Sequence, residues 1–319
     1  MTPGTAPATP AVPTDPTDTD VANLARLVTE QRLPGLDDLD ELPTLDLVRR
    51  MNEQDALVAG AVMAQAVPIA AAVDAIAARM RGGGRLIYLG AGTAGRIGLL
   101  DASECGPTFG TTGEVLGLIA GGPQAFAVAV EGAEDSPSLA VDDLTRIGLT
   151  PADAVVGLSA SGRTPFAVGG IRHARSLGAL TVGVACNRSS ALGAAAEIAI
   201  EVVVGPEFLT GSTRLKAGTA QKLVCNMIST LTMVRLGRTH GNLMTHLVAS
   251  NEKLWARAHD LVASITGLAD EEVGPALRAA EGSVPAAVIM LLTGADPAQA
   301  HAALNATSGN LREALSAVR

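Results

Sequence analysis

Small and hydroxyl-bearing residues gather at two points where an apolar run of the chain gives way to a helix-forming one. Residues 90–95, Gly-Ala-Gly-Thr-Ala-Gly, follow one apolar run, and residues 159–165, Ser-Ala-Ser-Gly-Arg-Thr-Pro, follow another. Glycines let the backbone turn tightly and approach a ligand, and the free N–H groups at a helix start attract anions. Hydroxyls beside such groups form a phosphate cradle that needs no metal. The two loops therefore predict a site for a phosphorylated or otherwise anionic small molecule.

Each loop also has a simpler interpretation. Gly92 is a candidate substrate ligand in the first loop, but the glycines there also suit a tight strand-to-helix turn that binds nothing. In the second loop, Thr164 before Pro165 is a natural helix N-cap. Capping alone does not account for three hydroxyls and a glycine in one loop, so we favour the binding site.

The first loop also matches the glycine pattern of dinucleotide-binding folds. Such folds place an acid at the end of the next strand, where it holds the ribose. Here the next apolar run ends in Gly121-Gly122, and Glu114 stands at its start instead. The pattern therefore favours a phosphate group over a nicotinamide dinucleotide.

Two glutamates are candidates for acid–base chemistry. Glu104 lies shortly beyond the first loop, where we expect it to close a helix over residues 95–103, and Glu134 lies in the run Val130–Asp135. Two carboxylates that face one pocket can hold different protonation states when burial raises the pKa of one of them. Such a pair supplies an acid and a base without a cofactor. The neighbouring Glu131 and Asp135 are expected on the surface.

A third polar cluster occupies residues 211–222. Ser212 or Thr213 is expected to cap a helix over residues 212–236, and Lys216 would lie on its first turn. A cation there opposes the helix dipole, which either attracts an anionic ligand or leaves a solvated lysine. Ser212 and Lys216 are therefore candidate substrate ligands. The five histidines lack the spacing of a zinc site, and we expect neither a metal nor a cofactor.

Composition narrows the class of protein. The 319 residues carry a formal net charge of −9, which argues against nucleic acid as a partner. No apolar run reaches the roughly 20 residues that a membrane helix needs, and the first residues do not read as a signal peptide. Three cysteines without paired spacing fit a reduced cytoplasm.

The elements that must position these residues alternate along the chain. Apolar runs predict five strands, at residues 86–89, 115–120, 154–158, 180–184 and 198–203. Helices are expected between them, near 95–103, 123–147, 165–177 and 190–196. Strands that are apolar on both faces and separated by helices predict an α/β fold, a parallel sheet covered on both sides.

Three further regions flank this sheet. Residues 1–20 are rich in proline and threonine and are expected to form a disordered tail. Residues 44–81 have helical spacing and would form an N-terminal helical arm, so that residues 21–245 make up the ligand-binding domain. A repeat with a period of 27 residues relates Leu277–Ala287 to Leu304–Ala314. We expect residues 246–319, with a helix over 246–267, to form a small helical subdomain.

Together these segments resemble the N-acetylmuramic acid 6-phosphate etherase family, which has the sugar isomerase (SIS) fold. The resemblance extends from about Leu27 to the C-terminus. It rests on residues 29–32, 86–104, 107–110, 129–135, 159–165, 205–222 and 242–244.

The resemblance implies cleavage of the D-lactyl ether of N-acetylmuramic acid 6-phosphate by elimination and hydration in cell-wall recycling, giving N-acetylglucosamine 6-phosphate and D-lactate. It also implies a three-layer SIS fold and a homodimer. By motif match, Glu104 takes the place of the proton donor and Glu134 that of the second catalytic carboxylate. The residues placed on the phosphate by the resemblance are Thr93, Ser159, Ser161 and Thr164.

Four positions depart from the family pattern: Leu33, Ala94, Gly106 and His246. Ala94 replaces a serine of the first loop and removes one hydroxyl. Two other functions remain open, a phosphosugar-binding regulator without catalysis and an aldose–ketose phosphate isomerase. The regulator would bind without turnover, and the isomerase would release no lactate.

Overall fold

A five-stranded parallel sheet forms the centre of the computed structural model, which describes residues 26–247, 249 and 251–318. Its strands are β1 (Leu86–Gly90), β2 (Val115–Ile119), β3 (Ala154–Ser159), β4 (Leu180–Ala185) and β5 (Ile198–Glu201). Their order is β2-β1-β3-β4-β5, and every neighbouring pair is parallel. The predicted α/β fold and its five strands are confirmed. The predicted tail, residues 1–20, lies outside the described residues.

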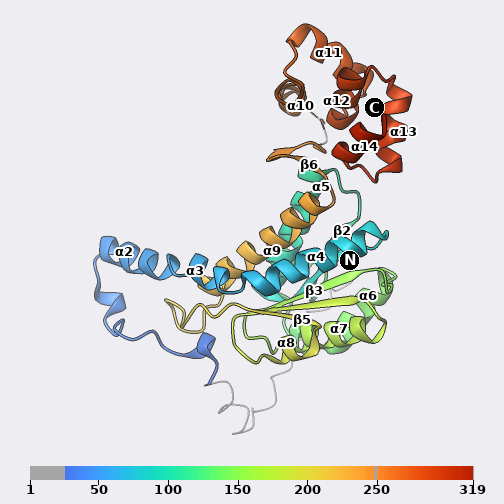
Figure 1. Ribbon diagram of the computed structural model, residues 1–319. Helices are drawn as coiled ribbons and strands as arrows, with labels where there is room; N and C mark the ends of the chain where they lie inside the picture. The colour runs from blue at the N-terminus through green and yellow to red at the C-terminus, as the bar shows by residue number, and fades with distance from the viewer. Residues whose placement is uncertain (1–25, 248, 250, 319) are drawn as a thin grey trace, which may run out of the picture.

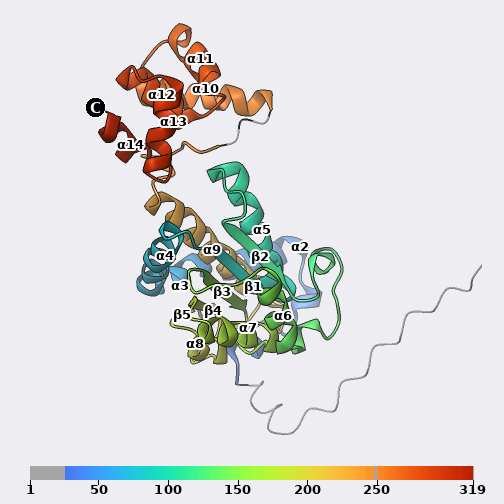
Figure 2. The same cartoon turned by 90° about the vertical axis from the view of Figure 1, so that its right-hand side faces the viewer.

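Helices cover both faces of this sheet (Figure 1, Figure 2). One face carries α4 (Ala66–Arg81), α5 (Gly92–Phe109) and α9 (Lys216–Arg235). The other face carries α6 (Pro137–Arg146), α7 (Pro165–Ser176) and α8 (Ala191–Ala195). Every residue of β1, β3 and β4 is buried, and a separate apolar core fills each side. Burial on both faces explains why these strands are continuous apolar runs.

The register brings the two predicted loops together. Gly90 at the end of β1 pairs with Leu158, one residue before the end of β3. The loops that follow β1 and β3 therefore leave the sheet side by side at its carboxyl edge. The helix after β1 packs on one face, and the helix after β3 on the other.

Two predicted helices are divided in the structure. The arm over residues 44–81 consists of α2 (Thr44–Asp55), α3 (Val58–Met63) and α4, with a bend of 59° between the α2–α3 segment and α4. Pro68 has no N–H to donate to the carbonyl of Ala64, which explains the break before α4.

No single helix among the described residues is long and apolar enough to cross a membrane, although this bent pair meets the length and composition criteria together.

The expected helix over residues 123–147 is wrong for its first half. That segment forms two short 3₁₀ turns, η3 (Pro123–Phe126) and η4 (Ala133–Asp135), before α6 begins at Pro137. Gly132 has a φ of +72°, a backbone conformation that an α-helix cannot contain. The chain between η3 and α6 is consequently a loop, and it carries Glu134.

The C-terminal helices have a core of their own. The hairpin β6 (Thr239–His240) and β7 (Leu243–Met244) leads into them. They are α10 (Glu252–Thr266), α11 (Asp270–Ala279), α12 (Val284–Thr293), α13 (Pro297–Ala306) and α14 (Leu311–Val318), and they share one apolar cluster. The helix predicted from residue 246 begins instead at Glu252, because the Asn251 side chain accepts a hydrogen bond from the N–H of Leu254.

The predicted 27-residue repeat corresponds to a repeated structure. Each copy spans a helix end, a glycine and the start of the next helix, with Gly282 at φ +83° in the first copy and Gly309 at φ +85° in the second. Its larger apolar positions are buried: Leu277, Val284 and Ala287 in one copy, and Leu304, Leu311 and Ala314 in the other. The repeat is therefore a packing pattern of helix pairs.

Candidate active site

The hydroxyls of the loop after β3 form one cluster. Ser159 is 2% exposed, and its Oγ lies 2.7 Å from Thr164 Oγ1 and 3.3 Å from Ser161 Oγ. The backbone N–H of Gly162 donates to Ser159 Oγ, and that of Arg163 donates to Ser161 Oγ. The loop thus presents several hydroxyls at the start of α7.

Thr164 occupies the predicted N-cap position of α7, but its side chain accepts no capping hydrogen bond. Gly162 has a φ of +70°, and the turn it makes brings Thr164 back to Ser159 at the end of β3. The prediction was right about the position and wrong about the hydrogen bond. The Thr164 hydroxyl belongs to the cluster and is available to a ligand there.

The loop after β1 turns directly into α5. A Cβ added at Gly95 would lie 2.6 Å from the carbonyl oxygen of Gly90, so only glycine fits there. α5 begins at Gly92, earlier than the predicted residue 95, and Thr93 is its second residue. Because the first N–H groups of a helix have no partner within the helix, this end of α5 can donate to an anion.

The two loops border a cavity of about 730 Å³. Gly92, all four predicted phosphate ligands and Glu134 line it. The remaining lining residues are Glu30, Ala91, Ala94, Asp135, Ala160, Arg163, Pro165, Thr213 and Gln221. One protomer thus brings together five of the predicted ligands and one of the two predicted carboxylates.

Glu104 does not line this cavity. It is exposed on α5, which continues to Phe109, so the expectation that Glu104 closes the helix is wrong. The span from Gly92 to Glu104 corresponds to about 18 Å along the helix axis, at roughly 1.5 Å per residue. Within one chain, Glu104 and Glu134 therefore do not face the same cavity.

Two other candidates also lie outside it. Lys216 is 1% exposed, and its Nζ donates to Gln54 Oε1 on α2 at 3.0 Å. Burial lowers the pKa of Lys216, whereas the carboxylates of Glu207 and Asp55 act in the opposite direction. Ser212 is not among the lining residues, although its neighbour Thr213 is.

The start of α9 is capped by Glu207. Its carboxylate accepts hydrogen bonds from the backbone N–H groups of Lys216 and Ala217, each at 2.9 Å. The expectation that Ser212 or Thr213 caps this helix is wrong. The helix begins at Lys216, four residues after the predicted start at residue 212. A carboxylate next to a helix start also offsets the positive end of the dipole.

Two residues of the cavity, Gln221 and Glu30, were not predicted as site residues from the sequence. Gln221 is 1% exposed on α9, and its Nε2 finds no hydrogen-bond partner among the described residues. Glu30 reaches the cavity from the N-terminal segment. The only sequence signal for Glu30 was its place in the family segment 29–32, and nothing in the pattern around Gln221 distinguishes it from a core glutamine.

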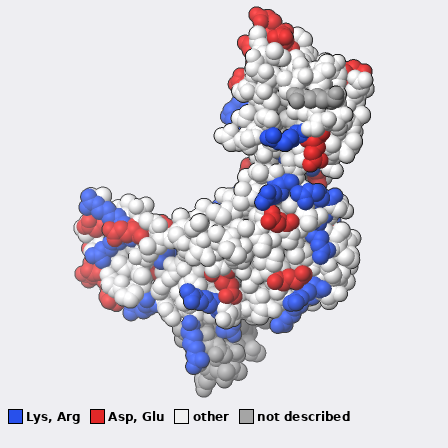
Figure 3. Space-filling model, viewed as in Figure 1, with Lys and Arg blue, Asp and Glu red and all other residues white. Residues whose placement is uncertain are grey.

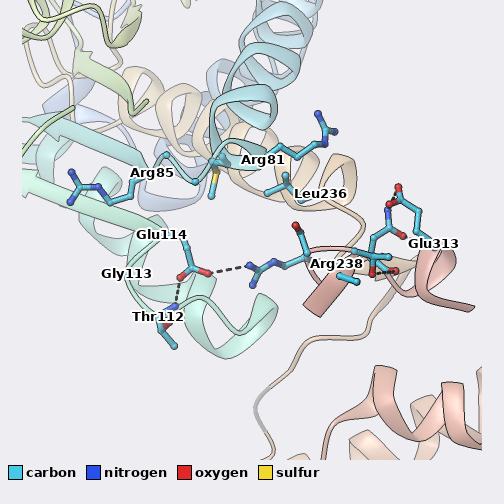
Figure 4. A pocket seen from close by; sticks show the side chains of 15 residues that line it. Arg81, Arg85, Thr112, Gly113, Glu114, Leu236, Arg238 and Glu313 are labelled. Atoms are coloured by element: carbon cyan, nitrogen blue, oxygen red, sulfur yellow. Dashed lines mark hydrogen bonds and ion pairs between the residues drawn. The ribbon is translucent and has the colours of Figure 1, made fainter. Parts of the chain in front are cut away.

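A second cavity, of about 610 Å³, lies at the opposite edge of the sheet, where the C-terminal helices meet it (Figure 4). Two of its arginines are already paired with carboxylates. Arg238 donates to Glu114 Oε1 at 3.1 Å, and Arg85 forms an ion pair with the buried Asp153. Burial alone would raise the pKa of Glu114, but hydrogen bonds from the Thr112 and Glu114 backbone and from Arg238 lower it overall. The charges of Arg85 and Arg238 are therefore largely offset by their own carboxylates.

Comparison with known proteins identifies the family. A profile described as the glucokinase regulatory protein N-terminal SIS domain matches residues 68–175. Proteins named N-acetylmuramic acid 6-phosphate etherase from Streptomyces coelicolor, Cronobacter sakazakii and Mycolicibacterium smegmatis are 61%, 56% and 53% identical to this chain. The alignments cover 91%, 90% and 91% of the chain and 93%, 97% and 97% of those proteins. The chain belongs to the N-acetylmuramic acid 6-phosphate etherase family. A solved phosphoheptose isomerase from Francisella tularensis aligns with a TM-score of 0.46 at 17% identity, over 59% of this chain and 100% of that one.

Of the four departures from the etherase pattern, only Ala94 lines the cavity. Gly106 lies within α5, and Leu33 follows the segment that carries Glu30. His246 lies between the sheet domain and the C-terminal helices, with its Nδ1 3.0 Å from Thr245 Oγ1. Burial and the nearby Arg238 lower the pKa of His246. Ala94 is thus the departure placed to alter ligand contacts.

Proposed function

We propose that this chain cleaves the D-lactyl ether of N-acetylmuramic acid 6-phosphate and releases N-acetylglucosamine 6-phosphate and D-lactate. The observation that carries the proposal is the 53–61% identity to named etherases along about nine-tenths of the chain. The cavity supports it, since hydroxyls, two helix starts and carboxylates line it. These are the groups that a phosphosugar elimination requires.

The phosphate is assigned to the hydroxyl side of the cavity. Ser159, Ser161 and Thr164 offer hydroxyl donors, and Thr93 adds one from the start of α5. The N–H groups at the starts of α5 and α7 point their dipoles toward the same space. This arrangement holds a dianion without a cofactor.

The chemistry is assigned to two carboxylates. A base removes the C2 proton, which the open-chain aldehyde at C1 makes acidic. Lactate then leaves from C3 with its oxygen protonated by an acid. Water adds to the resulting double bond, with its hydroxyl at C3 and a proton at C2. Glu134, which lines the cavity, is assigned to this chemistry, and the family motif assigns the proton donor to Glu104.

Glu104 reaches such a cavity only in another copy of the chain, so the proposal includes a homodimer. Glu104 and Leu100 lie four residues apart on one stripe of α5, and Leu100 is 39% exposed. The adjacent α9 exposes further apolar side chains: Met227, Leu231 and Val234. In the view of Figure 3, few charged side chains lie over α3 and α9. A symmetric contact that covers Leu100 also buries Glu104 against the partner.

The separate apolar core of α10–α14 supports a division into a sheet domain, residues 21–245, and a helical subdomain, residues 246–319.

A cytoplasmic location fits the substrate, which is a sugar phosphate, and the three buried free cysteines.

An assay of D-lactate tests the reaction. The purified chain, incubated with N-acetylmuramic acid 6-phosphate, is expected to release D-lactate and N-acetylglucosamine 6-phosphate in equal amounts. Glu104→Gln should abolish release while phosphosugar binding persists. Binding without lactate in the wild type would indicate a regulator, and a ketose phosphate product would indicate an isomerase.

A further inference from the structure

The side-chain amide of Asn187 connects the N-terminal segment that carries Glu30 to the loop after β3, residues 159–165, which is called the phosphate loop below. Asn187 is 2% exposed, and its Oδ1 accepts the backbone N–H of Val28 at 2.8 Å. Its Nδ2 donates to Thr29 Oγ1 at 3.1 Å. The same Nδ2 lies 3.2 Å from the carbonyl oxygen of Ala160 and 3.3 Å from that of Ser161.

These contacts join segments that are distant in the chain. Asn187 follows β4, the loop residues 160–161 follow β3, and Thr29 lies some 158 positions before Asn187. Thr29 is itself 1% exposed, so the segment enters the protein interior at this point. Because the Asn187 amide contacts both segments, it couples the position of residues 28–30 to that of the phosphate loop.

Glu30, which follows Thr29, lies at the cavity. It is exposed to solvent and lines the cavity together with Glu134 and the hydroxyl cluster. The Glu30 carboxylate also lies close to Gly211, because a Cβ added at Gly211 would lie 3.6 Å from Glu30 Oε2.

We propose that Glu30 binds the sugar part of the phosphosugar and that Asn187 is the residue that positions it. The proposal rests on the proposed function and adds a ligand contact to the same cavity. A carboxylate accepts hydrogen bonds from sugar hydroxyls or an acetamido N–H and repels a phosphate dianion. Glu30 therefore faces the uncharged part of the ligand, while the hydroxyl cluster takes the phosphate.

Two probes separate these roles. Binding of N-acetylglucosamine 6-phosphate and of inorganic phosphate is measured calorimetrically for the wild type and for Glu30→Gln. The substitution should weaken sugar phosphate binding roughly 10-fold, in line with a lost hydrogen bond to a charged group. It should leave phosphate binding unchanged or tighten it, because one negative charge leaves the cavity. Glu53→Gln, on the exposed face of α2 outside the cavity, is the matched control and should change neither affinity.

The positioning role of Asn187 is tested by a double-mutant cycle. Asn187→Asp replaces the Nδ2 donor by an acceptor that faces two carbonyl oxygens. Thr29→Val removes the hydroxyl acceptor with less disturbance and serves if Asn187→Asp does not fold. Either change should weaken sugar phosphate binding, and in the Glu30→Gln background it should cause little further loss. A purely structural role would instead lower both affinities and add to the effect of Glu30→Gln.

The outcomes distinguish this inference from the proposed function. Lactate release by the wild type with unchanged sugar phosphate affinity in Glu30→Gln overturns the inference alone. Equal weakening of sugar phosphate and inorganic phosphate by Glu30→Gln also overturns it. Weaker sugar phosphate binding with unchanged or tighter phosphate binding supports it even if the wild type releases no lactate. A wild type that binds neither probe overturns both proposals.

Discussion

Mixing two inactive variants shows whether the catalytic carboxylates come from different copies of the chain. Glu104→Gln and Glu134→Gln each remove one carboxylate, and each homodimer should be inactive. In the proposed dimer, every cavity combines Glu134 of its own chain with Glu104 of the other. A mixed dimer therefore contains one cavity with both carboxylates intact and one with neither.

The expected magnitude follows from this count. Random exchange of equal amounts makes about half of the dimers mixed, and each mixed dimer has one working cavity of two. The mixture should therefore recover about a quarter of wild-type lactate release. Glu104 cannot act in the cavity of its own chain, because it lies about 18 Å along α5 from the cavity residue Gly92, at roughly 1.5 Å per residue.

The assay uses differently tagged subunits, so that mixed dimers are isolated before D-lactate is measured. Isolated mixed dimers should show about half of wild-type activity per dimer. A control pairing of wild type with Glu104→Gln should also show about half, since one cavity stays complete. Mixed dimers of the two variants that are as inactive as their parents would refute the reasoning, because the two carboxylates would then act within one chain.

Four further changes test the site and its supports. Ala94→Ser adds a hydroxyl to the cavity wall and should tighten N-acetylglucosamine 6-phosphate binding by about 1.5 kcal/mol, roughly 10-fold, in calorimetry; weaker binding would contradict this. Gln221→Met removes a buried donor that has no partner within the described part of the chain, and it should raise the free energy of unfolding by about 1 kcal/mol, as read from urea midpoints. Asp153→Ala leaves Arg85 without its carboxylate and should lower that free energy by about 3 kcal/mol; a loss below about 1 kcal/mol would contradict the pairing. Because the fold lowers the pKa of His246 from its ordinary value of 6.5, the unfolded chain takes up its proton first and stability should fall as the pH drops below that value. His246→Asn should flatten this part of the pH profile.

The sheet and its two ligand loops were predictable because their signals are local. A fully buried parallel strand must be an apolar run, and the chain can leave it tightly only where small residues follow. Gly90 to Gly95 and Ser159 to Pro165 meet both conditions, so residue type and position indicated the cavity wall.

The positions of Glu104 and Glu30 depend on contacts that no local pattern reveals. Glu104 lies within α5 and not at its end, because that helix continues through Pro107 to a left-handed Gly110. Glu30 lines the cavity next to Thr29, which is hydrogen-bonded to Asn187 far along the chain. Spacing in the sequence therefore indicated candidate residues along the chain but not their positions in space.

The order of the strands has a consequence for how this family can change its chemistry. From β1 the chain steps outward to β2 and then returns across β1 to β3, so the helices after β1 and β3 diverge to opposite sides of the sheet. The opening between them is a topological switch point, and it exists whatever residues fill the two turns. Evolution can therefore exchange the side chains at its rim, as at Ala94, while the scaffold that creates the opening stays intact.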